Sequence, residues 1–190
     1  SDRVGIIAYA GSAFPQLPIT TDYAAAKMFL QALNTDMISS QGTAIGDAID
    51  LATTYYDDDN QTNRVLFIIS DGEDHEGEAV ARALAAARTG IIIYTVGVGS
   101  LSGSLIPIKS QKGVPQEYKR DRQGKLVTSQ LNEVALKEIA EAGNGIYVRF
   151  DNRISDSQKI MTADAQTSGG LLIALPQDRA LQFVETFNEI

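Results

Sequence analysis

The sequence predicts an α/β fold, a three-layer sandwich with helices on both faces of a mostly parallel central sheet. Continuous apolar runs at residues 65–69 and 91–98 are typical of strands that are buried on both faces. An alanine-rich helical stretch, residues 78–88, lies between them and ends at Gly90, so the three segments form a strand, helix, strand unit. With 190 residues, 44% of them hydrophobic and 21% charged, the chain is long enough for one ordinary globular domain.

A hairpin and two helices precede this unit. Residues 4–9 (VGIIAY) form a short β-branched run closed by Gly11, and residues 16–19 return antiparallel to it. A helix then begins after a predicted N-cap at Thr20 or Thr21, because apolar residues recur at helical spacing: Tyr23, Ala26, Phe29, Leu30 and Leu33. A second helix opens at Gly42 and Thr43 and runs to an acidic turn at residues 57–60. Its apolar face carries Ile45, Ala48, Ile49 and Ala52.

The rest of the chain repeats the alternation after a long irregular connection. Residues 99–128 show a loose pattern, with a small hairpin turning at residues 121–124. Asn132 is expected to cap a helix that carries Leu136, Ile139 and Ala140, and residues 146–150 form the next strand. A strand at residues 171–175 and a helix from Gln177, with Leu181, Val184 and Phe187 on one face, complete the prediction.

Composition excludes several classes of function. The net charge of −8 and the pI near 4.6 argue against nucleic acid, because a duplex binder neutralises phosphates with clustered Lys and Arg, and we find no cluster of that kind. No apolar run approaches the roughly 20 residues of a membrane helix, so the chain as given is expected to be soluble. The absence of cysteine excludes disulfides, thiolate metal sites and a cysteine nucleophile.

An acidic loop follows the first buried strand, in the stretch LFIISDGEDHEG, residues 66–77. Asp71 stands where that strand should end, which is where ligands bind in open parallel sheets. Asp71 and Thr43 offer oxygen atoms of the kind that Mg²⁺ prefers. The alternative interpretation is that Asp71 and Glu73 only cap the helix that follows, where its dipole favours acids.

Three weaker signals do not change this interpretation. His75, next to Ser70 and Asp71, lacks the G-x-S-x-G elbow of a hydrolytic triad. The glycines of GVGSLSGS do not fit the G-x-G-x-x-G pattern and are interpreted as a loop. The TSGG segment, residues 167–170, is a candidate for binding an anion, but it precedes a strand rather than opening a helix.

Several of these stretches resemble one family. DRVGIIAYAGSAFPQLPITTDYAAAKMFL, QGTAIGDAIDLA, VLFIISDGEDHEG, IIIYTVGVGS and LKEIAEAGNGIYVRF are similar to the von Willebrand factor A domain (Rossmann-like) of bacterial Bat aerotolerance proteins, over residues 1–150. The resemblance implies a metal-ion-dependent adhesion site built from an Asp-x-Ser-x-Ser motif, a Thr and an Asp. Thr43 and Asp71 match the last two. It also implies a protein partner that binds through the metal-site face, and a membrane-anchored parent protein of the bacterial cell envelope.

The family's first strand and helix, which carry the Asp-x-Ser-x-Ser motif, have no counterpart before residue 4. That strand is central, and its loss would leave unpaired backbone on two neighbours. We therefore expect the segment 151–190 to fill the gap with its strand and helix, as in a circularly permuted or chimeric chain, with Ile190 close to Ser1. The alternative is a strand and helix appended at an edge. The oligomeric state stays open, and a dimer that swaps this strand and helix is compatible with the pattern.

Even in the centre of the sheet, the tail would not restore the metal site. The residues after its strand, Ala174 to Asp178, offer no two hydroxyl groups at the required spacing. With Thr43 and Asp71 as the only protein ligands, Mg²⁺ would keep most of its waters and bind weakly or not at all. The sequence thus predicts an incomplete metal site.

The tail itself resembles another protein. TADAQTSGGLLIALPQDRALQFVETFNEI is similar to the carboxyl-terminal end of selenophosphate synthetase (selenide, water dikinase), but that enzyme's cysteine, lysine and metal-binding aspartates have no match here. Our main prediction is a non-catalytic protein-interaction module, and not an enzyme. Two alternatives remain: a fragment related to that ATP-dependent enzyme, and a fused scaffold without a selected activity.

Overall fold

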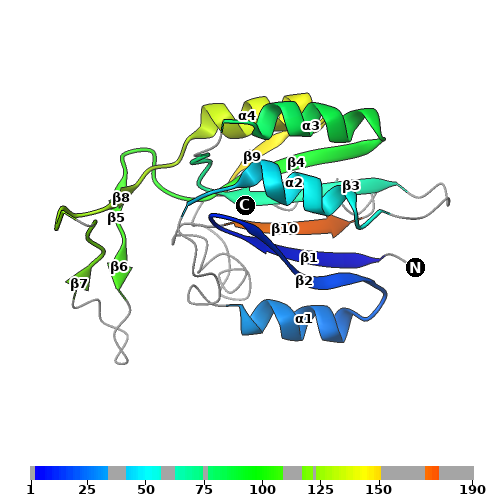
Figure 1. Cartoon of the computed structure of the whole chain (residues 1–190), viewed down its shortest axis with the longest axis horizontal. Coiled ribbons are helices and arrows are strands. Elements are labelled where there is room, and N and C mark those ends of the chain that lie inside the picture. Colours follow the sequence, from blue (N-terminus) through cyan, green and yellow to red (C-terminus); the bar gives the residue numbers. More distant parts are fainter. Residues whose placement is uncertain are drawn as a thin grey trace.

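The main sheet has six strands in the order β2-β1-β10-β3-β4-β9 (Figure 1). Our computed structural model describes residues 3–33, 42–56, 63–74, 77–108, 117–121, 123–150 and 170–175. Listed by their place in the sheet, the strands span Ala13–Thr20, Val4–Tyr9, Gly170–Leu175, Arg64–Ser70, Ile91–Gly97 and Tyr147–Arg149. The hairpin, the strand, helix, strand unit and the later strands are therefore where the sequence predicted them.

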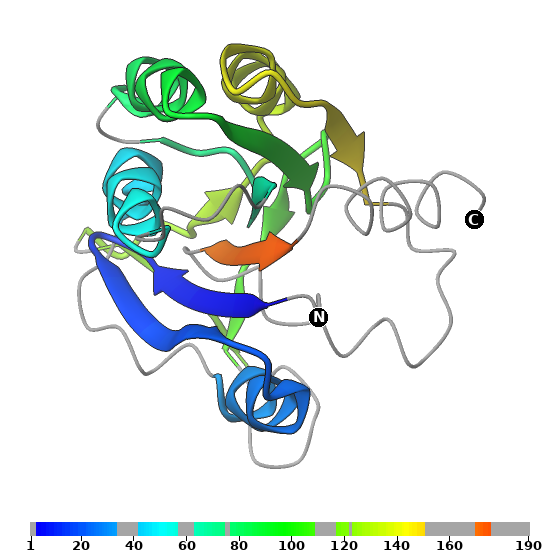
Figure 2. The ribbon, with the colours of Figure 1, turned by 90° about the vertical axis from the view of Figure 1, so that its right-hand side faces the viewer.

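Helices cover both faces of this sheet, which confirms the three-layer sandwich. Helix α1 (Tyr23–Ala32) lies on one face, and α2 (Ile45–Thr53), α3 (Ala79–Arg88) and α4 (Glu133–Ala142) lie on the other (Figure 2). Two caps explain where helices begin. The Asn132 side chain accepts a hydrogen bond from the Ala135 N–H at 3.2 Å, as predicted. Asp22, rather than Thr20 or Thr21, caps α1 and accepts from the Ala25 N–H at 2.9 Å.

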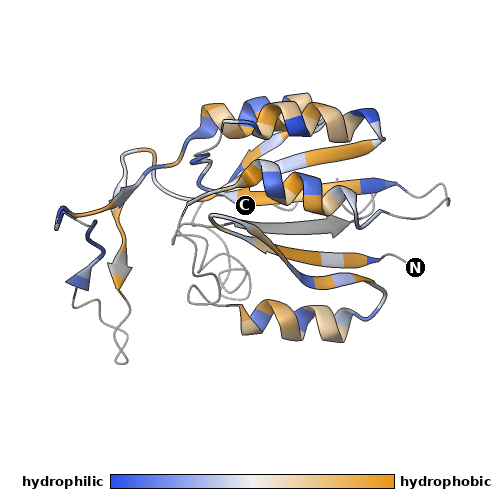
Figure 3. Ribbon diagram, viewed as in Figure 1, coloured by the Kyte–Doolittle hydropathy of each residue, from blue (hydrophilic) through white to orange (hydrophobic). Residues whose placement is uncertain are grey.

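Strand β3 shows how alternation builds two cores. Leu66 and Ile68 pack with α2, α3 and α4, while Val65, Phe67 and Ile69 belong to the cluster on the other face, which includes Ala26 of α1. All five side chains are buried, as expected of a strand covered on both faces. In Figure 3, β1 and β4 are coloured mainly as hydrophobic, while the helices mix hydrophobic and hydrophilic residues.

Strand β10 lies in the middle of the sheet, between β1 and β3, so the predicted gap is filled from the tail. Its direction differs from that of a circular permutation. A strand, helix, strand crossover joins parallel strands, so a permuted strand would run parallel to β1. Instead β10 runs antiparallel to both β1 and β3. Within the described residues β1, β3, β4 and β9 share one direction, and β2 and β10 oppose it.

Two small ribbons project from the sandwich (Figure 1). Strand β5 (Ser104–Leu105) pairs with β8 (Thr128–Ser129), and β6 (Pro107–Ile108) pairs with β7 (Glu117–Tyr118). The predicted turn at residues 121–124 lies at their tip, where the Asp121 N–H donates to the Lys125 carbonyl at 2.9 Å. We call the described residues between 101 and 130 the arm.

Some predictions lie outside the described residues. These are the helix from Gln177, the proximity of Ser1 and Ile190, the acidic turn at residues 57–60, and the side chains of His75 and Asp178.

Candidate functional site

The two predicted ligands both lie at the edge of the sheet where β1, β3 and β4 end. Asp71 follows β3 directly, and Thr43 lies two residues before α2. Both side chains are 3% exposed. Buried polar groups need partners, so the contacts of each side chain decide what it can still bind.

The Asp71 carboxylate is held by groups of its own chain. Its Oδ2 accepts a hydrogen bond from the Ser129 hydroxyl at 2.9 Å, and its Oδ1 accepts from the Glu73 N–H at 3.3 Å. The Asp71 carbonyl accepts from the Asn132 N–H at 2.7 Å. These bonds tie the loop after β3 to the base of the arm and to the start of α4.

The loop after β3 depends on a glycine. Gly72 has a φ of +76°, a conformation that side chains disfavour. A Cβ at this position would lie 2.6 Å from the Asn132 carbonyl oxygen and 2.8 Å from Cγ of Leu136. The Gly72 N–H donates to the buried Ser70 hydroxyl at 3.0 Å. The turn that presents Asp71 is thus packed directly against α4.

Thr43 is positioned by the end of β1. The next residue, Ala44, donates its N–H to the Ala10 carbonyl at 2.7 Å. Gly42 has a φ of +132°, and a Cβ there would lie 3.4 Å from Cα of Gly11. The Thr43 loop therefore lies against the turn of the first hairpin.

The amino end of β10 separates the two loops. Gly170 is paired with Tyr9 and Leu171 with Ile69, so β1 and β3 stand two strand spacings apart, about 10 Å. In the predicted arrangement the Asp-x-Ser-x-Ser motif follows the carboxyl end of the central strand. Here Leu175, at that end, pairs with Val65 at the start of β3, on the opposite edge of the sheet. The carboxyl end of β10 therefore lies at the edge opposite to Thr43 and Asp71.

Tyr9 is a polar neighbour that the sequence pattern did not reveal. Its side chain is 1% exposed, and its hydroxyl donates to the Ile69 carbonyl at 3.5 Å. Burial raises the pKa of Tyr9 well above its usual value; the hydroxyl of Ser70 acts in the opposite direction, and the carboxylates of Asp71 and Asp74 add to the rise. Tyr9 stays neutral at physiological pH and contributes a hydroxyl group beside the acidic loop.

Another acid of this loop, Asp74, contacts the start of α3. The N–H of Ala79, the first residue of α3, donates to Oδ2 of Asp74 at 3.4 Å, while Asp71 bonds to Ser129 and Glu73. Sequence reasoning also missed Ser129, because a serine at the end of an irregular connection carries no pattern of its own. The glycine-rich loop packs against Asp71, because a Cβ added to Gly99 would lie 3.9 Å from Cβ of Asp71.

The donor groups described at this edge can be compared with those that a divalent cation needs. Mg²⁺ takes about six oxygens in near-ideal octahedral geometry. Among the residues that the structure describes, no group of three or more His, Cys, Asp or Glu side chains is placed to hold a metal ion. The predicted donors are the hydroxyl of Thr43 and the Asp71 carboxylate, which Ser129 and Glu73 already engage.

Comparison with known proteins identifies the fold and its relatives. Residues 1–161 match the model of the von Willebrand factor type A domain. The crystal structure of a conserved hypothetical protein, BatB, from Bacteroides thetaiotaomicron is 47% identical, with a TM-score of 0.75; the match covers 85% of this chain and 77% of that one. An aerotolerance-related membrane protein from Bacteroides fragilis NCTC 9343, with multiple mutations to serines, is 44% identical, with a TM-score of 0.74 and coverage of 86% and 78%. No curated protein matches the chain. Within the described residues, no helix is long and apolar enough to cross a membrane.

Proposed function

Because this chain belongs to the von Willebrand factor type A domain family, we propose that it is a non-catalytic protein-interaction module that binds its partner without a tightly held divalent cation. Its partner would contact the edge of the sheet around Thr43 and Asp71. The parent protein would be anchored in a bacterial envelope membrane, in line with the description of the Bacteroides fragilis relative as a membrane protein.

The observation that carries this proposal is the burial and the hydrogen bonding of the Asp71 carboxylate. In this family's adhesion site a carboxylate at this position helps to hold the metal, with an acid and two hydroxyls from the central strand. Here the carboxylate is 3% exposed and accepts from Ser129 at 2.9 Å, and the central strand runs in the opposite direction. Hydrogen bonds within the chain thus hold the Asp71 carboxylate, whereas a cation holds it in the family's adhesion site.

The test is a calorimetric titration of the whole chain with Mg²⁺ and with Mn²⁺. We expect affinity no tighter than millimolar, because an ion held by one carboxylate and one hydroxyl keeps most of its waters. The matched variants are Asp71→Ala and Asp47→Ala, the second at an exposed acid of α2. Micromolar affinity that Asp71→Ala removes and Asp47→Ala preserves would contradict the proposal. An assay of ATP turnover with selenide is expected to show no activity and checks the non-catalytic part.

A further inference from the structure

Acidic side chains gather at the sheet edge where Thr43 and Asp71 lie. The loop after β3 carries three of them, and α2, α3 and α4 each have one at their start. These six acids are Asp47, Asp71, Glu73, Asp74, Glu78 and Glu133. The negative charge of this edge therefore comes from side chains that the structure describes.

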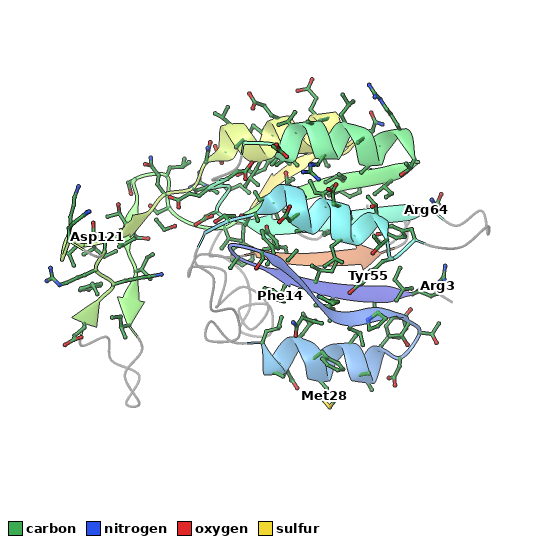
Figure 4. The ribbon with its side chains drawn as sticks, viewed as in Figure 1. Arg3, Phe14, Met28, Tyr55, Arg64 and Asp121 are labelled. Atoms are coloured by element: carbon green, nitrogen blue, oxygen red, sulfur yellow. The ribbon has the colours of Figure 1, made fainter. Side chains whose placement is uncertain are left out.

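Few described cations of the sandwich offset these acids. Those that pair with them, through Glu78 and Glu133, are Arg82, Lys137 and Arg149. Arg3 and Arg64 lie at the other end of the sheet, where β1 and β3 begin (Figure 4). The seven residues of β3 separate the two ends by about 20 Å, more than twice the screening length of about 8 Å. Among the described residues of the sandwich at this edge, acids are thus in excess.

Helix N-termini account for some of these acids, because a carboxylate is stabilised near the positive end of a helix dipole. Asp47, Glu78 and Glu133 fit this explanation. Glu73 does not, since it lies outside the helices, is partly exposed and forms no side-chain hydrogen bond with the described residues. Its charge is therefore open to a partner.

Thr43 adds a second, independent observation at the same edge. Its side chain is 3% exposed, yet its hydroxyl forms no hydrogen bond with the residues that the structure describes. Among those residues, the hydroxyl that is fully enclosed without a partner is that of Tyr55, towards the other end of the sheet (Figure 4). The oxygen of Thr43 therefore belongs to the small part of its surface that is exposed. A buried polar group of this kind gains free energy when a ligand or water supplies its missing hydrogen bond.

The contacts of Asp71 favour a lysine ammonium over other cations. Mg²⁺ needs about six oxygens in octahedral array, whereas an ammonium needs acceptors for three N–H donors and has no fixed coordination geometry. Arginine binds a carboxylate best through both oxygens at once, but the Ser129 hydroxyl and the Glu73 N–H each engage one oxygen of Asp71. A carboxylate oxygen accepts a second hydrogen bond, so a single N–H of an ammonium can be added.

We propose that a lysine side chain of the partner protein binds at this edge, where its ammonium donates to the Thr43 hydroxyl and the Asp71 carboxylate and lies near the charge of Glu73. This inference rests on the proposed function, because it specifies the chemistry of that module's partner. An edge that held a divalent cation would attract an anionic group of a partner. Without the cation the preferred charge is reversed.

Other occupants gain less from this edge. Nucleic acid and anionic membranes carry the same sign of charge as the six acids and are repelled. A second copy of the chain brings a net charge of −8 with it. A lysine-bearing segment of another protein gains the attraction without that repulsion.

The experiment measures binding of a fluorescein-labelled synthetic peptide of lysine, glycine and serine to the whole chain by fluorescence anisotropy, with EDTA present. Peptides with arginine or with acetyl-lysine in place of lysine are the ligand controls. The main variant is Thr43→Val, which removes the hydroxyl but no charge, and Thr43→Ser restores the hydroxyl. Its matched control is Thr89→Val, at the carboxyl end of α3. Glu73→Gln removes one charge, and its control is Glu141→Gln, an exposed acid at the carboxyl end of α4.

We expect Thr43→Val to weaken binding of the lysine peptide about tenfold, because it removes a hydrogen bond to a charged group, and Thr43→Ser to restore binding. Glu73→Gln is expected to weaken it about threefold, while Glu141→Gln and Thr89→Val change it by less than about twofold. The arginine peptide is expected to bind less tightly than the lysine peptide, and the acetyl-lysine peptide, which lacks the charge, to bind least.

Several outcomes overturn the inference. One is absence of binding, and another is equal binding of the lysine and arginine peptides. Equal weakening by Glu73→Gln and Glu141→Gln, without an effect of Thr43→Val, also overturns it, because the attraction is then to the net charge of the chain. So does tighter binding of a glutamate peptide that needs Mg²⁺, or concentration-dependent dimerisation that Thr43→Val abolishes.

The two proposals fail separately, because calorimetry tests the cation and the peptide tests the partner. If Mg²⁺ binds weakly and the lysine peptide does not bind, only the partner chemistry is wrong. If Mg²⁺ binds with micromolar affinity that Asp71→Ala removes, while the lysine peptide in EDTA still depends on Thr43, only the absence of a tightly held cation is wrong.

Discussion

The two halves of the main sheet differ in the directions of their paired strands. In the half formed by β3, β4 and β9, parallel strands pair over long registers, from Arg64 with Ile91 to Ser70 with Gly97, and α3 and α4 cover one face. In the half formed by β2, β1 and β10, each described pairing is antiparallel, and the central strand comes from the far end of the sequence. The first half is built around a strand, helix, strand unit, whereas the second takes the strand next to β3 from the tail, in the opposite direction.

This difference affects which residues reach the candidate site. A parallel strand delivers the residues after it to the same edge as its neighbours, so β3 delivers Asp71 to the site. A reversed strand delivers its amino end to that edge, and β10 places Gly170 beside Tyr9 there. Backbone hydrogen bonds form in either strand direction. The side chains that a strand brings to a given edge of the sheet depend on its direction.

The largest expected effect tests whether β10 supports the sheet. We propose that the segment 151–190 completes the domain and is not appended at an edge of the sheet. Ile173 pairs with Ile6 on one side and Phe67 on the other. Ile173→Pro removes a ladder hydrogen bond in a central strand and is expected to lower the free energy of unfolding by more than about 3 kcal/mol, measured by urea denaturation.

The control for this prediction is Ile173→Val, which keeps the backbone N–H and is expected to lower the free energy of unfolding by much less than Ile173→Pro. If Ile173→Pro unfolds at the same urea concentration as the unaltered chain, β10 does not lie in the centre of the sheet in solution.

The next effect tests how closely the loop after β3 packs against the start of α4. Gly72→Ala places a Cβ against the Asn132 carbonyl and Leu136 at a φ of +76°. We expect a loss of about 2–3 kcal/mol in the free energy of unfolding, from backbone strain and overpacking together. Gly124→Ala is the control, because its φ is +81° but its Cβ would meet no atom within 4 Å. Equal losses would show that strain alone, without contact with α4, accounts for the glycine.

A smaller effect tests whether Ser129 holds Asp71. Ser129→Ala removes the hydrogen bond to Oδ2 and is expected to destabilise the chain by about 1–2 kcal/mol, because the partner is a buried carboxylate. Ser102→Ala, at an exposed serine of the same arm, is the control and is expected to change stability by less than about 0.5 kcal/mol. Thermal unfolding monitored by circular dichroism measures both. If the two variants match, Asp71 does not depend on Ser129.

The smallest effect at neutral pH concerns Tyr9. Its pKa is raised in the folded state, so unfolding releases a proton once the pH exceeds the unfolded value of about 10. Stability is therefore fully present below pH 10 and falls as the pH rises above it, by up to about 1.4 kcal/mol per pH unit for each such group. Tyr9→Phe is expected to change stability by less than about 1 kcal/mol at pH 7.

At pH 11 the same variant should lose less stability, relative to pH 7, than the unaltered chain does. Urea denaturation at both pH values measures this. Tyr23→Phe, at an exposed tyrosine of α1, is the control and should leave the alkaline loss unchanged. An unchanged alkaline loss in Tyr9→Phe would mean that its hydroxyl is not buried beside the acidic loop.

Local patterns accounted for most of the elements and part of the site. The helical spacing of Ile45, Ala48, Ile49 and Ala52 predicted the buried face of α2, and the Asn132 cap was readable because its signal lies within four residues. The position of Asp71 after a buried run was likewise enough to place it at the sheet edge. Ser129 and Tyr9 had no such signal, because they approach Asp71 and the end of β3 only after the chain folds back on itself.

By itself, then, the sequence determined which segments are strands and helices, the pairing of β3 with β4 through a helix, and the presence of a strand at residues 171–175. The direction of that strand was decided only in the tertiary structure. An apolar run carries the same side chains in either direction, and both ladders satisfy the backbone, so no local preference separates the two. That direction places the carboxyl end of β10 at the edge of the sheet away from Asp71.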